Sequence, residues 1–343
     1  MPRQTIPSRR SHRLPLLAAG AFTAIALTAC SSGPDSTPTT STHTTARANR
    51  APRGVVTVQE ASRLLTAYEN SNNRANKVRS EEILAKVEGG QLNAQSRADY
   101  RQFKTWSAKQ QAYYGSPFRY THRSYMIPPA GTATWFAVKA VATGTKSKSP
   151  SLLIFDKDGP AYKMVLALYV DKSTIPAVAL DKNGLAKPAD PATPVGSLAP
   201  AQLSSAFEDL AETGGKKTGK KLASTPAVKD ARTLYTNRGK RDDSKYATTK
   251  YFATKVKASK VYALHLADGG VLAAFPTAHN QETLLRPAYR SNYKINPNKV
   301  EALYNPAGRT VITDEFQGQA LATLTPSGTP HVLAYEYRMV DSR

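Results

Sequence analysis

The sequence has a single cysteine, Cys30, so the chain cannot form an internal disulfide bond. It also lacks a long hydrophobic run. The apolar stretch near its start, Leu14–Ala26, covers about 13 residues, whereas a membrane-spanning helix needs roughly 20. Acidic residues are few, with 25 Asp and Glu against 47 Lys and Arg, which gives a formal net charge of +22. Without a disulfide bond, the stability of the fold must come from buried apolar area. The positive net charge favours anionic partners.

Motifs for covalent or metal-dependent catalysis are also missing. The chain has no Gly-x-Ser-x-Gly elbow and no Ser-x-x-Lys motif followed by Lys-Thr-Gly. No two histidines are spaced at i,i+4. The segments Asp156-x-Asp158-Gly159 and Asp181-x-Asn183-Gly184 resemble the opening of a calcium loop but lack its closing glutamate, and such dipeptides favour turns. These patterns predict neither an enzyme nor a bound metal or cofactor.

The first 30 residues have the three parts of an export signal: a basic start, a short apolar stretch and small residues at a cleavage point. The segment Leu27-Thr28-Ala29-Cys30 resembles the lipobox of bacterial lipoproteins. This resemblance implies cleavage between Ala29 and Cys30, and a diacylglycerol, often with a third acyl chain such as palmitate, at Cys30. The mature protein is then expected on the outer face of the cell membrane. The basic start contains Arg3, Arg9, Arg10 and Arg13.

Two points about export stay open. A plain secretory signal cut near Thr28–Cys30 would release a free protein, whose lone thiol would be a liability in an oxidising compartment. Ser8-Arg9-Arg10 leaves the choice between the general and the twin-arginine routes undecided. In either case, removing residues 1–29 takes away four arginines and no acid, so 43 basic residues remain against 25 acidic ones, a balance of +18.

The chain divides into a tether and two predicted folded units. Residues 30–54 hold the lipidated Cys30 and a Ser/Thr/Pro-rich segment with almost no large apolar side chain, which predicts disorder. Residues 55–186 favour helices and then antiparallel strands. Apolar residues recur with a helical period before Pro117 and at about every second residue beyond it. Residues 187–197 hold three prolines and predict a linker. Residues 198–343 repeat the order of helices and strands, and an internal duplication stays open.

Boundaries within these units follow from local signals. Thr57 and Glu60 have capping-box spacing at the start of the first helix. Gly89-Gly90 is expected to end the second helix, and a third is expected from Ala94 to Tyr114. The later strands are expected at 251–257, 260–266, 270–275, 318–325 and 330–339.

Helices followed by an antiparallel sheet, in units of about 130–145 residues, indicate the α+β class. This arrangement resembles the NTF2-like, or cystatin-like, cone fold, here twice in tandem. The whole chain, with its lipobox and Ala/Thr-rich tether, resembles uncharacterised actinobacterial lipoproteins of the Streptomyces type. That family has no assigned activity, so the resemblance implies a location and not a reaction.

Two groups of residues are candidate binding sites. The aromatic residues between Tyr100 and Tyr125 form either a core or the wall of a ligand cavity, with His122 and Arg123 as its polar candidates. A second segment is either a contact for an anionic polymer or a solvated loop. It carries Lys216, Lys217, Lys220 and Lys221.

The function that these patterns favour is non-enzymatic binding or scaffolding at the cell envelope. The partners are the lipid bilayer, through acylated Cys30, and an anionic wall polymer or another envelope protein. Nucleic acid is not expected, because the sequence has no zinc-finger, RNP or recognition-helix pattern. The alternatives are an enzyme or small-ligand carrier with a pocket in the cone, and a solute-binding lipoprotein of a transporter. A pocket with converging polar groups would favour the enzyme or carrier.

Overall fold

The computed structural model describes residues 53–143, 149–170, 174–240 and 243–343. The predicted signal peptide, the cleavage between Ala29 and Cys30, the lipidation of Cys30 and the tether up to residue 52 lie outside these described residues. Backbone pairing is already present at residue 53, because the Ala130 amide donates to the Arg53 carbonyl at 2.7 Å. Within the described ranges, no helix is both long and apolar enough to cross a bilayer.

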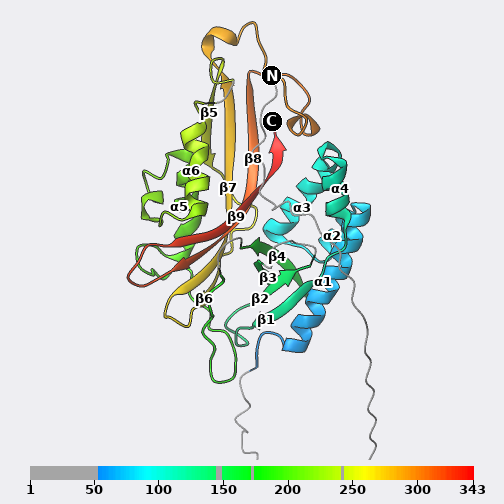
Figure 1. Ribbon diagram of the computed structural model, residues 1–343, viewed down its shortest axis with the longest axis vertical. Coiled ribbons are helices and arrows are strands. Elements are labelled where there is room, and N and C mark those ends of the chain that lie inside the picture. The colour runs from blue at the N-terminus through cyan, green and yellow to red at the C-terminus, as the bar shows by residue number, and fades with distance from the viewer. Residues whose placement is uncertain (1–52, 144–148, 171–173, 241–242) are drawn as a thin grey trace, which may run out of the picture.

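Four helices form one side of the first half (Figure 1). They are α1 (Val58–Val78), α2 (Glu81–Ala85), α3 (Gly90–Gln102) and α4 (Ala108–Gly115), with the 3-10 turn η1 (Phe103–Thr105) between the last two. The Thr57 hydroxyl accepts a hydrogen bond from the Glu60 amide at 3.1 Å, so the predicted cap at the start of α1 is confirmed.

Two expected helix boundaries are wrong. Gly89 is the N-cap of α3, so the Gly89-Gly90 pair begins a helix instead of ending one. The single helix expected from Ala94 to Tyr114 is interrupted, because the Ser107 side chain forms a capping box with Gln110 and starts α4. The interruption lets α3 and α4 run in different directions around the same space.

The strands form two antiparallel sheets, which confirms the α+β class with helices and antiparallel sheets. The first sheet has the order β1-β2-β3-β4 and the second β5-β7-β8-β9, with β6 paired to β7. The first contains β1 (Tyr120–Met126), β2 (Trp135–Ala142), β3 (Pro150–Asp158) and β4 (Ala161–Tyr169). The second contains β5 (Ala247–Ala253), β6 (Tyr262–His265), β7 (Val271–Leu285), β8 (Val311–Leu324) and β9 (His331–Ser342), with α5 (Leu203–Glu212) and α6 (Pro226–Asn237) beside it. The remaining 3-10 turns are η2 (Pro200–Gln202), η3 (Gly219–Lys221), η4 (Pro287–Tyr289) and η5 (Glu301–Leu303).

Strands β7 and β8 are longer than the alternation of apolar residues predicted. The pattern ended at Phe275, whereas β7 continues to Leu285, and β8 begins at Val311 and not at Gly318. The missed part of β7 contains buried polar residues such as Thr277 and His279, which are 0% and 3% exposed. A pattern based on apolar residues does not detect a strand whose buried side chains are polar.

One hydrophobic cluster joins the two sheets. It combines Trp135 and Leu152 of the first sheet with Tyr262 and Leu321 of the second, and the rings of Trp135 and Tyr262 lie 5.3 Å apart.

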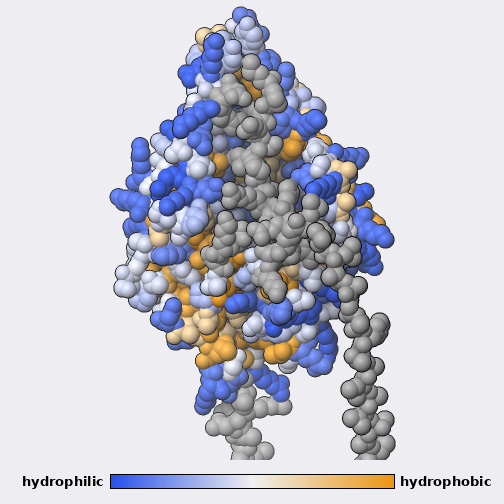
Figure 2. All heavy atoms as spheres, in the orientation of Figure 1, coloured by the Kyte–Doolittle hydropathy of each residue, from blue (hydrophilic) through white to orange (hydrophobic). Residues whose placement is uncertain are grey.

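Hydrophilic residues cover most of the face in Figure 2, with hydrophobic ones in its lower part, where β6 and β1 lie in Figure 1. The predicted linker 187–197 touches this region, since the Ala189 amide donates to the Ala263 carbonyl at 2.9 Å. The division into two units stays a prediction.

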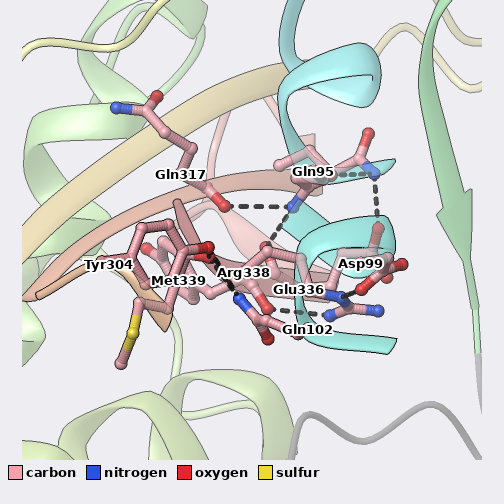
Figure 3. Close-up of polar contacts among 10 residues, drawn as sticks. Gln95, Asp99, Gln102, Tyr304, Gln317, Glu336, Arg338 and Met339 are labelled. Atoms are coloured by element: carbon pink, nitrogen blue, oxygen red, sulfur yellow. Dashed lines mark hydrogen bonds and ion pairs between the residues drawn. The ribbon is translucent and has the colours of Figure 1, made fainter. Parts of the chain in front are cut away.

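Helix α3 contacts both sheets, and its side toward the second sheet is polar (Figure 3). The Gln95 amide nitrogen donates to the Gln317 carbonyl at 3.1 Å, and that of Gln102 to the Met339 carbonyl at 2.6 Å. Nε of Arg338 lies 2.8 Å from Oδ1 of Asp99, and these side chains are only 6% and 2% exposed. These bonds fix the position of α3 against β8 and β9.

We predict that Arg338→Met destabilises the protein by about 3–5 kcal/mol, because the buried Asp99 carboxylate loses its guanidinium. Urea unfolding measures the loss. Arg97→Met is the matched control, since Arg97 lies on α3 near Asp99 and forms an exposed ion pair. Its Nε lies 2.7 Å from Glu81, and 59% and 48% of the two side chains are exposed. That variant is expected to lose less than about 1 kcal/mol. Equal losses in both variants would contradict the role given to the buried pair.

Candidate functional site

A cavity of about 190 Å³ lies between the helices of the first half and strand β9 of the second sheet. Its walls come from α1, α3, α4, β4 and β9, together with the ends of neighbouring loops. Aromatic rings make up much of the wall, and polar side chains converge among them. The rings belong to Tyr68, Tyr113, Tyr114, Phe118, Tyr169 and Tyr335, and the polar groups include Asn72, Asn76, Glu88, Ser96 and Glu336.

Helix α1 supplies a polar stripe to the cavity, because Tyr68, Asn72 and Asn76 follow one another at a spacing of four residues. These side chains belong to a continuous chain of hydrogen bonds. The Tyr100 hydroxyl donates to Asn76 at 2.8 Å, and the Asn76 amide donates to Asn72 at 2.7 Å. Asn72 and the Tyr68 hydroxyl then donate to Oε1 of Glu88 at 2.9 and 3.0 Å. The chain therefore ends at a carboxylate in the cavity wall.

The backbone holds Glu88 in place. The segment before α3 bridges to β4, since the Gly89 amide donates to the Met164 carbonyl at 3.0 Å and the Met164 amide to the Val87 carbonyl at 2.9 Å. Glu88 is only 2% exposed. Burial, followed by the negative charge of Glu88, raises the pKa of the Tyr68 hydroxyl well above its usual range. Tyr68 thus stays protonated and donates to the carboxylate.

The aromatic segment predicted as core or cavity wall has both roles. Tyr113, Tyr114 and Phe118 line the cavity. Tyr100 and Tyr120 are buried, at 8% and 2% exposure, and therefore belong to the core.

The structure does not bring His122 or Arg123 to this cavity. His122 is exposed at an irregularity of β1, where its φ angle is 50°. The Arg123 guanidinium lies 2.7 Å from the buried Glu69 carboxylate and donates to the Tyr120 carbonyl at 2.8 Å. Neither is among the described residues that line the cavity, which include the acidic residues Glu88 and Glu336.

The lysine-rich segment 216–221 folds around a buried carboxylate. Oδ2 of Asp209 accepts hydrogen bonds from the amides of Lys217 and Gly219, both at 2.8 Å. The lysine side chains point outward, and that of Lys217 forms an exposed ion pair with Glu212 at 2.9 Å. All four predicted contact residues are exposed: Lys216, Lys217, Lys220 and Lys221.

A second polar cluster lies between α5 and the second sheet. Glu208 accepts hydrogen bonds from Thr277 and, at 2.6 Å, from the Tyr337 hydroxyl, and it contacts Nδ1 of His279 at 3.1 Å. Glu208 and His279 are each 3% exposed, and Phe316 stacks on the imidazole ring at 5.1 Å. These groups are buried, and their bonds join α5 to β7 and β9.

The acidic turns predicted from the sequence are structural. Oδ1 of Asp181 accepts from the amides of Asn183 and Leu185 at 2.8 and 2.9 Å, and Gly159 lies in the turn between β3 and β4. In the part of the chain that the structure describes, no group of three His, Cys, Asp or Glu residues could hold a metal ion.

Residues 52–343 match a family model described as a domain of unknown function, DUF8094. The chain belongs to this family. An uncharacterised lipoprotein of Streptomyces coelicolor is 32% identical over 338 residues, which are 94% of this chain and 92% of the relative. The resemblance to uncharacterised Streptomyces lipoproteins is therefore confirmed. No solved structure matches the chain. The described residues that line the cavity run from Tyr68 to Glu336, within the DUF8094 region.

Removing one donor to Glu88 tests the polar chain. We predict that Tyr68→Phe destabilises this DUF8094 protein by about 1–3 kcal/mol, because a buried carboxylate loses a hydrogen bond. Tyr113→Phe is the matched control, since Tyr113 lines the same cavity but is 40% exposed. Thermal unfolding should show almost no change in the control. A comparable loss in both variants would mean that the bond to Glu88 contributes little.

Proposed function

We propose that this DUF8094 protein is a lipid-anchored, non-enzymatic binding protein of the cell envelope, and that the cavity is its ligand site. The observation that carries the proposal is the convergence of the buried Glu88, the amides of Asn72 and Asn76, and several aromatic rings on one space of about 190 Å³. Ligand sites are concave and mainly apolar, with a few placed polar groups. This geometry favours a small-ligand carrier over scaffolding alone.

The anchor is supported by two independent findings. The segment Leu27-Thr28-Ala29-Cys30 has lipobox spacing, and the relative from Streptomyces coelicolor is named a lipoprotein. Two or three acyl chains at Cys30 would hold the protein stably on the outer face of the membrane. Residues 31–52 would then connect the bilayer to the folded part, whose backbone pairing begins at Arg53.

Metabolic labelling with an alkyne analogue of palmitate tests the anchor. We expect the wild-type protein to be labelled and its mature N-terminal peptide to begin at a modified Cys30. Cys30→Ala should carry no label, because the acceptor thiol is absent, whereas the adjacent control Ser31→Ala should be labelled normally. An unlabelled wild type, or a labelled Cys30→Ala variant, would reject lipidation at this residue.

Two finer parts of the sequence interpretation bear on this proposal. The NTF2-like cone stays a proposal for each sheet, supported by helices α1 and α3 beside the first sheet and α5 beside the second. The sequence also left open a solute-binding lipoprotein of a transporter, a class of protein that usually has α/β lobes with parallel strands. The strands in the described ranges pair antiparallel, which favours a carrier of another type.

The lysine-rich segment 216–221 is a proposed contact for anionic polymers of the envelope. Its support is the bonding around Asp209, which orders the segment while its four lysine side chains face solvent. Basic side chains near an anionic surface each contribute about 1 kcal/mol, an attraction that salt screens.

Replacing Lys216, Lys217, Lys220 and Lys221 together by Gln should weaken binding of the detergent-solubilised mature protein to purified wall teichoic acid at least tenfold at low salt. Co-sedimentation at several salt concentrations measures this. The control replaces four other exposed lysines, one of them also ion-paired: Lys86, Lys104, Lys109 and Lys182. If both sets weaken binding equally, net charge and not this segment is responsible.

A further inference from the structure

We infer that the tip loop, residues 286–310 between β7 and β8, binds an acidic polysaccharide of the cell wall. This surface is separate from the ligand cavity and from the lysine-rich segment, and the inference rests on the proposed function only for the location at the envelope. A connection of 25 residues is long for two paired strands, which are commonly joined by about two to five residues. Long ordered loops in compact proteins usually carry a function.

The tip loop is held in one shape by hydrogen bonds. Ile295 and Arg309 pair like strand residues, since each amide donates to the carbonyl of the other at 2.7 and 3.1 Å. Helix α3 supports the loop from the side, because the Arg101 guanidinium donates to the Leu303 carbonyl at 3.0 Å. A surface that is ordered before its partner arrives loses less conformational entropy on binding.

Three tyrosine rings form a row at this loop. The ring centroid of Tyr289 lies 5.2 Å from that of Tyr246, just before β5, and 6.0 Å from that of Tyr293. The Tyr293 amide donates to the Tyr289 carbonyl at 3.0 Å, a turn that brings these two rings together. Tyr293 is 60% exposed and Tyr246 is 36% exposed. Single exposed rings are common on protein surfaces, whereas a contiguous exposed group marks an interaction site.

The charge beside the row is positive. The one acidic residue of the tip loop, Glu301, is buried at 1% exposure. The Arg286 and Arg290 guanidinium groups donate to backbone carbonyls at 3.1 and 2.8 Å, and these neutral acceptors position the groups without cancelling their charge. The surface therefore favours an anionic partner. Four basic side chains of the loop are exposed: Arg286, Arg290, Lys294 and Lys299.

An acidic polysaccharide matches both the rings and the cations. The C–H groups on one face of a sugar ring can pack against the face of a tyrosine ring, and the phenol hydroxyl can bond to sugar hydroxyls. The carboxylates of acidic sugars can form charge-assisted hydrogen bonds with Arg and Lys. An anionic polymer without rings would use only the basic side chains and leave the tyrosine row without a role.

The position of the loop favours the cell wall over the bilayer, although tyrosine and basic residues also suit lipid headgroups. In Figure 1 the tip loop lies at the upper end of the long axis, beyond β7 and β8. The described chain begins near the lower end, where Gly54 pairs with Pro129 after β1. An anchor that precedes residue 53 is therefore attached at the end of the molecule opposite the tip loop.

Calorimetric titration of the detergent-solubilised mature protein with three hexamers tests the inference. Hexagalacturonate carries sugar rings and carboxylates, maltohexaose carries sugar rings alone, and hexa-aspartate carries carboxylates alone. We expect hexagalacturonate to bind at least tenfold more tightly than each of the others, because only this probe engages both the rings and the cations. Equal binding of hexa-aspartate would leave a charge attraction only, and equal binding of maltohexaose would remove the role of charge. Either result, or binding of none of the three, would overturn the inference.

Variants place this binding at the tip loop. Tyr293→Leu should weaken the binding of hexagalacturonate about fivefold or more, because the most exposed ring of the row is lost. The double variant Lys294→Gln and Lys299→Gln should weaken it by a similar factor at low salt and by less at high salt, since salt screens exposed charges. Binding as tight as in the wild type in both variants would place the contact elsewhere and overturn the inference.

The controls change a ring and two charges away from the tip loop. Phe252→Leu alters a side chain that is 36% exposed near the other end of β5. The double variant Lys182→Gln and Lys187→Gln removes the same charge from exposed positions beside Ala186, whose amide donates to the Ile127 carbonyl just after β1. Both controls should bind hexagalacturonate normally. Thermal unfolding establishes that every variant is folded.

Hydrogen exchange of the mature protein reconstituted in phosphatidylglycerol vesicles separates the polysaccharide from the bilayer. We expect the amides of the tip loop to gain protection only when hexagalacturonate is added. Protection by the vesicles alone would identify lipid headgroups as the occupant and overturn the inference. The titrations measure the folded part and do not depend on Cys30, so a failure of palmitate labelling would reject the proposed anchor without changing their outcome.

Discussion

The buried polar face of α3 is the constraint on which the arrangement of this molecule depends. Gln95 and Gln102 donate to backbone carbonyls of β8 and β9, while Asp99 holds Arg338. A buried donor or acceptor that loses its partner costs about 1–3 kcal/mol, so the helix has little freedom to shift against the sheet. The adjacent face of the same helix carries Leu92 and Ser96, which line the cavity. The contacts that join the two halves therefore also shape the candidate site.

Charge in this protein is divided between its surface and its cavity. The exposed lysines around residues 216–221 belong to a strongly basic exterior, whereas Glu88 and Glu336 are among the described residues that line the cavity. Net charge describes how the whole chain meets an envelope surface, and it carries no information about which side chains line a single cavity. The anionic partners expected from composition consequently concern the exterior of the molecule and not the cavity.

Local signals in the sequence predicted several elements correctly and others poorly. The cap at Thr57 depends on residues three apart, and the strands of the first sheet follow from short apolar runs such as 152–155 that are bounded by turn residues. The extension of β7 past Phe275 was missed because its buried residues are polar and are satisfied by partners such as Glu208, which is distant in sequence. The spacing of Tyr68, Asn72 and Asn76 is a local sign of a polar helix face, as is that of the polar residues of α3. Glu88, which accepts hydrogen bonds from Tyr68 and Asn72, could not be assigned from spacing.

The sequence by itself determined the α+β class, the order of the elements and the lipobox-like segment at Cys30, because each depends on residues close together in the chain. Only the tertiary structure decided which side chains share a cavity. Tyr68 and Glu336 are separated by most of the folded chain, yet they line the same space because α3 packs between β4 and β9. That packing brings Glu88 and Glu336, and not His122 or Arg123, to the cavity. Each long-range hydrogen bond in this region joins groups whose proximity no local sequence pattern encodes.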